Sequence, residues 1–269
     1  MQIELIPLYV LTGVFSGLLG GALGLGGGIV VVPMLLLLFH LRDMDPAVMM
    51  QVAVATSLAT IMVTSVGAVR AHHQRGSLRW PLVRQMGTGV LIGAFAGAFV
   101  ADALSGPALT RLFGLFSVLL SVQMLIMSVR QRKAAPGPEQ LPAPRVLTLA
   151  GGGIGLVSSL FGIGGGSLTV PLLSAFRVRM VEAVAVSSAC GLPIAVAGSI
   201  GFVVAGLGNP ALPAGSLGYV YLPAAVGIGL ASYPMARVGA SLAHRLPATT
   251  LKRIFAGVLF IIGLRLALG

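Results

Sequence analysis

The 269-residue sequence has few acidic residues and a single cysteine. All six Asp and Glu residues fall at or near the ends of apolar runs, so the sequence offers no buried carboxylates for a proton relay or a cation site. Cys190 has no second cysteine with which to form an internal disulfide. Its place in an apolar run favours a small packing residue, and the alternative that it lines a path for a ligand stays open.

Charge of either sign is scarce, since 9% of the residues are charged and 57% are hydrophobic. Such a chain cannot hide its apolar surface in one water-soluble core, so we expect it to live in a lipid bilayer. A net charge of +11 would suggest a nucleic-acid partner in a soluble protein. Here the basic residues form short clusters between apolar runs, which is typical of a topology signal. The predicted partner is therefore the bilayer and not nucleic acid.

Catalytic and cofactor patterns are missing as well. The four histidines lie at the ends of apolar runs without the spacing of metal ligands. The apolar runs hold no Ser/His/Asp or His-Glu-x-x-His arrangement, and no glycine stretch continues into the Gly-Lys-Ser/Thr of a nucleotide loop. The sequence therefore predicts no metal, no cofactor and no enzymatic activity.

What the chain does contain, twice, is a glycine-rich motif. The first copy reads Gly24-Leu25-Gly26-Gly27-Gly28-Ile29-Val30-Val31-Val32-Pro33. The second lies 138 positions later and reads Gly162-Ile163-Gly164-Gly165-Gly166-Ser167-Leu168-Thr169-Val170-Pro171. Each glycine inside a helix costs roughly 1 kcal/mol relative to alanine. Both copies therefore mark a place where a buried helix is interrupted.

Apolar runs bounded by charges, glycine and proline predict ten helical elements. They cover approximately residues 5–22, 28–40, 47–69, 82–101, 108–129, 145–160, 166–176, 182–206, 219–236 and 250–268. The stretch 130–145 carries four prolines and four basic residues, so it is a solvated linker. It separates a first membrane repeat, residues 1–129, from a second, residues 146–269. The predicted fold is an all-α integral membrane protein with two repeats of five elements.

Five elements is an odd number, so the two repeats must insert with opposite orientation. With ten elements, 14 of the 17 basic residues fall on one side of the membrane, and only Arg42, Arg111 and Arg265 fall on the other. If the glycine motifs were only kinks inside longer spans, this bias would vanish. The excess of basic residues predicts a cytoplasmic linker and both termini on the outside.

The second and seventh elements are too short to cross a bilayer. Twelve residues at about 1.5 Å each cover roughly 18 Å of a hydrocarbon core about 30 Å thick. Their glycine ends must then stop inside the membrane and present unpaired N–H groups and the positive end of a helix dipole, one from each side. This arrangement predicts an anion site at the midplane, around which the two repeats alternate access. The alternative is that the glycines only allow close helix packing.

Hydroxyl residues occupy matching places in the third and eighth elements, where Thr56-Ser57 aligns with Ser187-Ser188. These hydroxyls could complete the anion site, although membrane Ser and Thr often bond to their own helix backbone. Pro193 predicts a kink in the eighth element. The candidate binding residues are Gly24, Gly26, Gly27, Gly28, Thr56, Ser57, Gly162, Gly164, Gly165, Gly166, Ser187 and Ser188, with structural roles for Pro33 and Pro171.

Two copies of Gly-x-Gly-Gly-Gly-x4-Pro in a small hydrophobic chain resemble the sulfite exporter TauE/SafE family. The resemblance covers both repeats. It implies a permease of the bacterial inner membrane that moves sulfite or organosulfonate anions, generally outward, with periplasmic termini. Two classes stay open: an anion transporter, which is favoured, and a membrane-embedded enzyme or scaffold subunit whose glycines serve packing. The sequence does not specify the oligomeric state.

Overall fold

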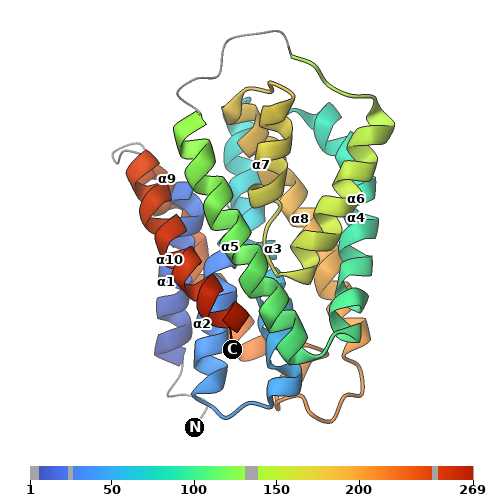
Figure 1. Cartoon of the computed structure of the whole chain (residues 1–269), viewed down its shortest axis with the longest axis vertical. Coiled ribbons are helices and arrows are strands. Elements are labelled where there is room, and N and C mark those ends of the chain that lie inside the picture. The colour runs from blue at the N-terminus through green and yellow to red at the C-terminus, as the bar shows by residue number, and fades with distance from the viewer. Residues whose placement is uncertain (1–5, 24–26, 131–138, 244–247, 269) are drawn as a thin grey trace.

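The computed structural model describes residues 6–23, 27–130, 139–243 and 248–268 (Figure 1). Within these residues the chain forms ten helices and one short hairpin. The elements are α1 (Ile6–Leu23), α2 (Gly28–His40), α3 (Pro46–Gln74), α4 (Trp80–Ala103), α5 (Gly106–Arg130), α6 (Pro144–Leu160), α7 (Gly166–Ala175), α8 (Met180–Ala205), β1 (Ser216–Leu217), β2 (Val220–Tyr221), α9 (Leu222–Ala243) and α10 (Ala248–Leu268). The all-α fold predicted from the apolar runs is confirmed.

Four of the helices are long and apolar enough to cross a membrane by length and composition, namely α3, α4, α5 and α8. Shorter apolar helices lie in α1, α2, α7, α9 and α10. Large hydrophobic side chains point outward along many of the helices, and Ile92, Leu149 and Leu230 are at least 70% exposed. Such a surface suits lipid rather than water. The protein is an integral membrane protein.

The closest helix pairs join the first half of the chain to the second. α1 packs on α9, α4 packs on α6 and α5 packs on α10. Glycines make these contacts possible: a Cβ on Gly93 of α4 would lie 2.0 Å from the Gly152 carbonyl of α6, and one on Gly13 of α1 would lie 2.5 Å from the Ile228 carbonyl of α9. Small residues that let helix backbones meet are common in membrane proteins. The two halves therefore interlock instead of forming separate bundles.

The two short helices point in opposite directions from the middle of the molecule. α2 has 13 residues and α7 has 10, or roughly 20 Å and 15 Å at about 1.5 Å per residue. In Figure 1, α2 occupies the lower half of the molecule and α7 the upper half. Both begin at the third glycine of a motif triplet, as predicted. Pro33 and Pro171 are each the sixth residue of their helix, where each removes one backbone donor.

α3 and α8 pack against each other, and each also contacts one of the short helices. α2 packs on α3, and α7 packs on α8. Pro193 lies inside α8, where we expect it to bend the helix. Cys190, also on α8, is fully buried. Burial fits the packing role expected for this cysteine.

A hairpin that the sequence reading missed precedes α9. The ninth element was expected from residue 219, but β1 and β2 occupy residues 216–221 and the helix begins at Leu222. Gly215 and Gly218 have φ values of 89° and 53°, which favour glycine. A Cβ on Gly218 would also lie 2.3 Å from the Val203 carbonyl. Tyr219, Val220 and Tyr221 are buried, because the hairpin packs on α3 as well as on α8.

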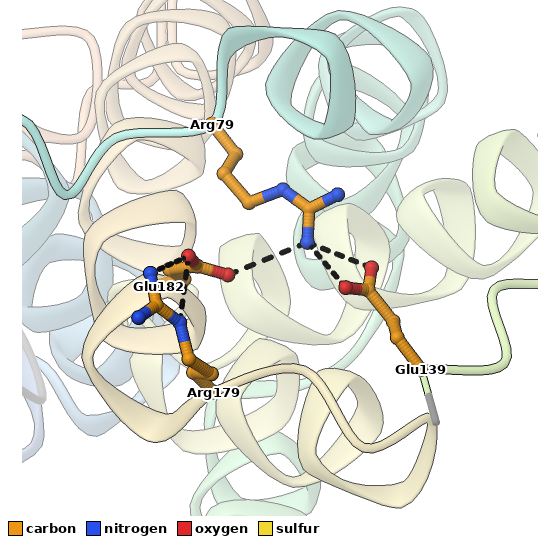
Figure 2. A network of polar contacts seen from close by, with 4 residues as sticks. All are labelled: Arg79, Glu139, Arg179 and Glu182. Atoms are coloured by element: carbon orange, nitrogen blue, oxygen red, sulfur yellow. Dashed lines mark hydrogen bonds and ion pairs between the residues drawn. The ribbon is translucent and has the colours of Figure 1, made fainter.

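Polar contacts join the two halves at both ends of the molecule. At the end where α2 stops, Arg42 Nη1 donates to the Tyr221 hydroxyl at 2.9 Å. At the opposite end, Arg79 Nη1 lies 2.7 Å from Glu139 Oε1 and 3.3 Å from Glu182 Oε2 (Figure 2). Arg79 directly precedes α4 as its N-cap residue, whereas Glu182 lies in the first turn of α8.

Candidate anion-binding site

The second glycine motif first stops one helix and then starts another. At the end of α6, the Gly162 N–H donates to the Ser159 carbonyl at 3.2 Å and the Ile163 N–H donates to the Ser158 carbonyl at 2.9 Å. This pair of bonds is a Schellman motif, which requires a left-handed residue, and Gly162 has a φ of 64°. Gly165 then caps α7 with an ordinary φ of −56°.

The first motif starts α2 with a different backbone conformation. Gly27 caps α2 with a φ of 72°, in the left-handed region. The Ser16 hydroxyl of α1 donates to the Gly27 carbonyl at 3.3 Å. A Cβ on Gly27 would lie 2.7 Å from Ser16 Oγ. The backbone conformation at position 27 therefore favours glycine, whereas that at the corresponding position 165 does not. Gly24 and Gly26 lie outside the described residues.

The two motifs meet inside the molecule. A Cβ on Gly28 would lie 2.5 Å from the Gly162 carbonyl, so only glycine lets the two segments approach this closely. Ser57 of α3 donates to the Gly162 carbonyl at 2.7 Å and lies 3.4 Å from the Gly28 carbonyl. One buried hydroxyl thus contacts both motifs.

The start of α7 is surrounded by buried hydroxyls. Leu168 and Thr169 N–H donate to the Gly165 carbonyl, so the amides of Gly166 and Ser167 precede the first helical hydrogen bond. The side chains of Ser167, Thr169 and Ser187 are 4%, 0% and 1% exposed. Their hydroxyls have no hydrogen-bond partner within the part of the chain that the structure describes.

Thr169 and Ser187 lie next to Gly165. A Cβ there would lie 3.3 Å from Thr169 Oγ1 and 3.7 Å from the Ser187 carbonyl. A buried hydroxyl without a partner is unfavourable by about 1 to 3 kcal/mol, so such a cluster needs a ligand or water to be satisfied. Amide and hydroxyl donors at the positive end of a helix dipole suit an anion. In the described residues, no group of three or more His, Cys, Asp or Glu could hold a metal ion.

The family model described as "Sulfite exporter TauE/SafE" matches residues 9–266. The chain belongs to the TauE/SafE family. A probable membrane transporter protein from Haemophilus influenzae is 34% identical over 263 residues, which cover 98% of each chain. A probable membrane transporter protein from Methanocaldococcus jannaschii is 26% identical over 267 residues, covering 97% of this chain and 94% of the relative. No solved structure shows a significant match. The protein is thus a membrane transporter of the TauE/SafE family.

Two predicted hydroxyls of this TauE/SafE protein already have partners away from α7. Thr56 Oγ1 accepts a hydrogen bond from the Tyr221 N–H at 3.0 Å, which holds the hairpin against α3. Ser188 donates to the Val184 carbonyl of its own helix at 2.9 Å. Of their aligned counterparts, Ser57 contacts both glycine motifs through its hydroxyl, and the backbone of Ser187 lies next to Gly165. A role for any of these residues in binding stays a prediction, as it does for Gly164, which lies between the end of α6 and Gly165.

Ser16, Ser167 and Thr169 were not among the predicted site residues. A signal for two of them was present, because Ser167 and Thr169 directly follow the second glycine triplet, where the first copy has Ile29 and Val31. The hydroxyl donors therefore gather at α7, whereas the corresponding side chains of α2 are aliphatic. No local pattern singled out Ser16, because its contact with Gly27 depends on how α1 packs.

Proposed function

We propose that this protein is a secondary transporter that exports a small sulfur-containing anion, such as sulfite or an organosulfonate, across the bacterial inner membrane. Membership of the TauE/SafE family supports the substrate class and the direction, through the description of the family as sulfite exporters. The anion accepts hydrogen bonds from the first amides of α7 and from the hydroxyls of Thr169 and Ser187. The observation that carries this proposal is the set of buried, unpartnered hydroxyls at the start of a short helix.

Transport by alternating access needs a site that can open to each side in turn. The contact between Gly28 and Gly162 joins the start of α2 to the end of α6, four residues before α7 begins, and α2 and α7 lead to different ends of the molecule. Contacts between the halves cover both ends, through Arg42 with Tyr221 at one and Arg79 with Glu182 at the other. We propose that these two contacts open alternately while the anion stays near Gly165.

A substitution series at Gly165 tests the site. Its φ of −56° accepts a side chain, and the nearest atom to a new Cβ is the mobile end of Ile194 at 3.0 Å. Gly165→Asn and Gly165→Asp differ in charge and hardly in size. Because Asp places a negative charge at the positive end of α7, we expect it to abolish sulfite and methanesulfonate binding that Asn only weakens. Ser187→Ala should weaken binding by roughly threefold to tenfold, the loss of one hydrogen bond.

Binding is measured on purified full-length protein by calorimetry, and the folding of each variant is checked by its thermal unfolding. If a folded Asp variant bound these anions as tightly as the Asn variant, the proposed site at α7 would be wrong. The glycines would then serve helix packing, as they do between α4 and α6.

A further inference from the structure

The helix segments that meet at the glycine motifs hold no Asp, Glu, Lys, Arg or His away from their outer ends. Residues 5–39, 46–69, 146–176 and 183–236 hold no Asp, Glu, Lys, Arg or His. These ranges include nearly all of α1, α2, α3, α6, α7 and α8. A ligand at Gly165 is therefore held by dipoles alone, namely amide groups, hydroxyls and the end of α7.

The hydrogen-bond donors at this site are neutral amide and hydroxyl groups. The amides of Gly166 and Ser167 lie at the start of α7, and the hydroxyls of Thr169 and Ser187 are at least 99% buried and without a partner in the described part of the chain. Thr169 Oγ1 is aimed at Gly165, 3.3 Å from where its Cβ would be. The unpartnered hydroxyls indicate a ligand at this place. This observation is independent of the argument from the helix dipole.

A neutral site of this kind discriminates between anions by their charge. The attraction between an ion and fixed dipoles grows in proportion to the charge, whereas the hydration that the ion loses grows with the square of the charge. A buried arginine or lysine would offset the larger dehydration penalty of a dianion, but the ranges given above contain none. A monoanion therefore gains more from this site, relative to water, than a dianion of the same shape.

The hydroxyls also tolerate a proton on the ligand. A serine or threonine hydroxyl can donate or accept, so Thr169 and Ser187 can turn to accept a hydrogen bond from a protonated oxygen. An ammonium or guanidinium group, which has donors only, could not do this. The donor set thus accepts an oxyanion that carries one proton as well as one that carries none.

We infer that this site selects singly charged oxyanions over doubly charged ones, so that the transported species is an organosulfonate monoanion or hydrogen sulfite, and sulfate is excluded. This inference rests on the proposed transport of a sulfur-containing anion and adds the charge state of the substrate. It follows from the neutrality of the site and not from the family description.

Methanesulfonate and sulfate are a matched pair for the test, because both have a tetrahedral sulfur that carries an SO3 group. In sulfate a fourth oxygen replaces the methyl group and brings one more negative charge. On full-length protein in neutral-lipid nanodiscs, we expect methanesulfonate to bind at least roughly tenfold more tightly than sulfate, which corresponds to about 1.4 kcal/mol. Sulfite adds a titration in one compound, since its second proton dissociates near neutral pH. Its apparent affinity should fall as the pH rises, while that of methanesulfonate, a monoanion throughout, should stay constant and report any titration of the protein.

The outcomes separate the two proposals. Sulfate binding as tightly as methanesulfonate, or sulfite affinity that rises with pH, would overturn the charge selectivity and leave anion transport intact. Binding of none of the three anions would instead overturn the proposed function, and the charge selectivity with it. Ser187→Ala should weaken methanesulfonate and monoanionic sulfite by a similar factor, which ties the selectivity to the site at α7.

Discussion

The Ser57 hydroxyl of α3 donates a 2.7 Å hydrogen bond to the Gly162 carbonyl, so a helix from the first half of the chain binds the second glycine motif. Gly162 is the left-handed residue that ends α6. Its carbonyl oxygen is also the atom nearest to a Cβ placed on Gly28. The bond therefore fixes the position of both motifs relative to α3. Four predictions follow from this and other contacts.

Removing the Ser57 hydroxyl should destabilise the junction between the motifs. Ser57→Ala leaves the buried Gly162 carbonyl without this donor, which should lower the free energy of unfolding by about 1 to 3 kcal/mol. Ser188→Ala is the matched control, because that hydroxyl only bonds to Val184 of its own helix, and it should have an effect of about 0.5 kcal/mol or less. Unfolding by denaturant in detergent measures both. Equal effects would mean that the contact with Gly162 contributes nothing.

Alanine should be tolerated in one motif and not in the other. Gly28→Ala places a Cβ 2.5 Å from the Gly162 carbonyl, a backbone atom that cannot move aside cheaply. We expect a loss of at least about 1 to 3 kcal/mol, or failure to fold. Gly165→Ala meets only the flexible end of Ile194 at 3.0 Å and should stay within about 1 kcal/mol of the parent.

Size-exclusion profiles and thermal unfolding of the two alanine variants compare them directly. A Gly28→Ala protein as stable as the parent would show that the two motifs separate more easily than their contact suggests.

The ion pairs at the end of the molecule where α4 begins should hold the last residues of the linker in place. Arg79 contacts Glu139 and Glu182 together, and Glu182 also pairs with Arg179 (Figure 2). Next to Glu139, the Gln140 N–H donates to the Phe176 carbonyl just after α7. Arg79→Gln should release Glu139 and speed hydrogen exchange at Gln140, whereas stability should change by only about 0.2 to 1 kcal/mol because the pair is partly exposed.

High salt should reproduce part of the effect of Arg79→Gln, since it screens exposed charges. Arg179→Gln is the control, because Arg179 contacts Glu182 and leaves Arg79 with Glu139. Unchanged exchange at Gln140 in the Arg79 variant would mean that the linker is held by other contacts.

The orientation in the membrane can be tested on the single-cysteine background. Native Cys190 is buried, so it should add little labelling of its own. Ala211→Cys, in the exposed segment before the hairpin, should react with an impermeant reagent added outside intact cells. Gln140→Cys, at the exposed end of the linker, should react only after the cells are opened. The reverse pattern would invert the predicted topology.

The hydroxyl residues mark the limit of what sequence alignment between the two halves of the chain could predict. Thr56 and Ser187 align, yet the first bonds to the hairpin, and the second has no hydrogen-bond partner among the residues that the structure describes. Ser57 and Ser188 align, yet the first joins the two motifs and the second bonds to its own helix. Alignment located the residues, but the roles of Thr56 and Ser57 depend on neighbours that are more than a hundred positions away.

The sequence by itself determined the membrane location, the ten helical elements and the start of both short helices, because hydrophobic runs and glycine or proline breaks act locally on the backbone. Only the tertiary structure decided which helices pair and which hydroxyls lack a partner. The pairing of α1 with α9 and of α4 with α6 depends on glycines from both halves matching in space. A hydrogen bond forms only where that packing brings donor and acceptor together, so the anion-binding potential of α7 became visible only in the folded chain.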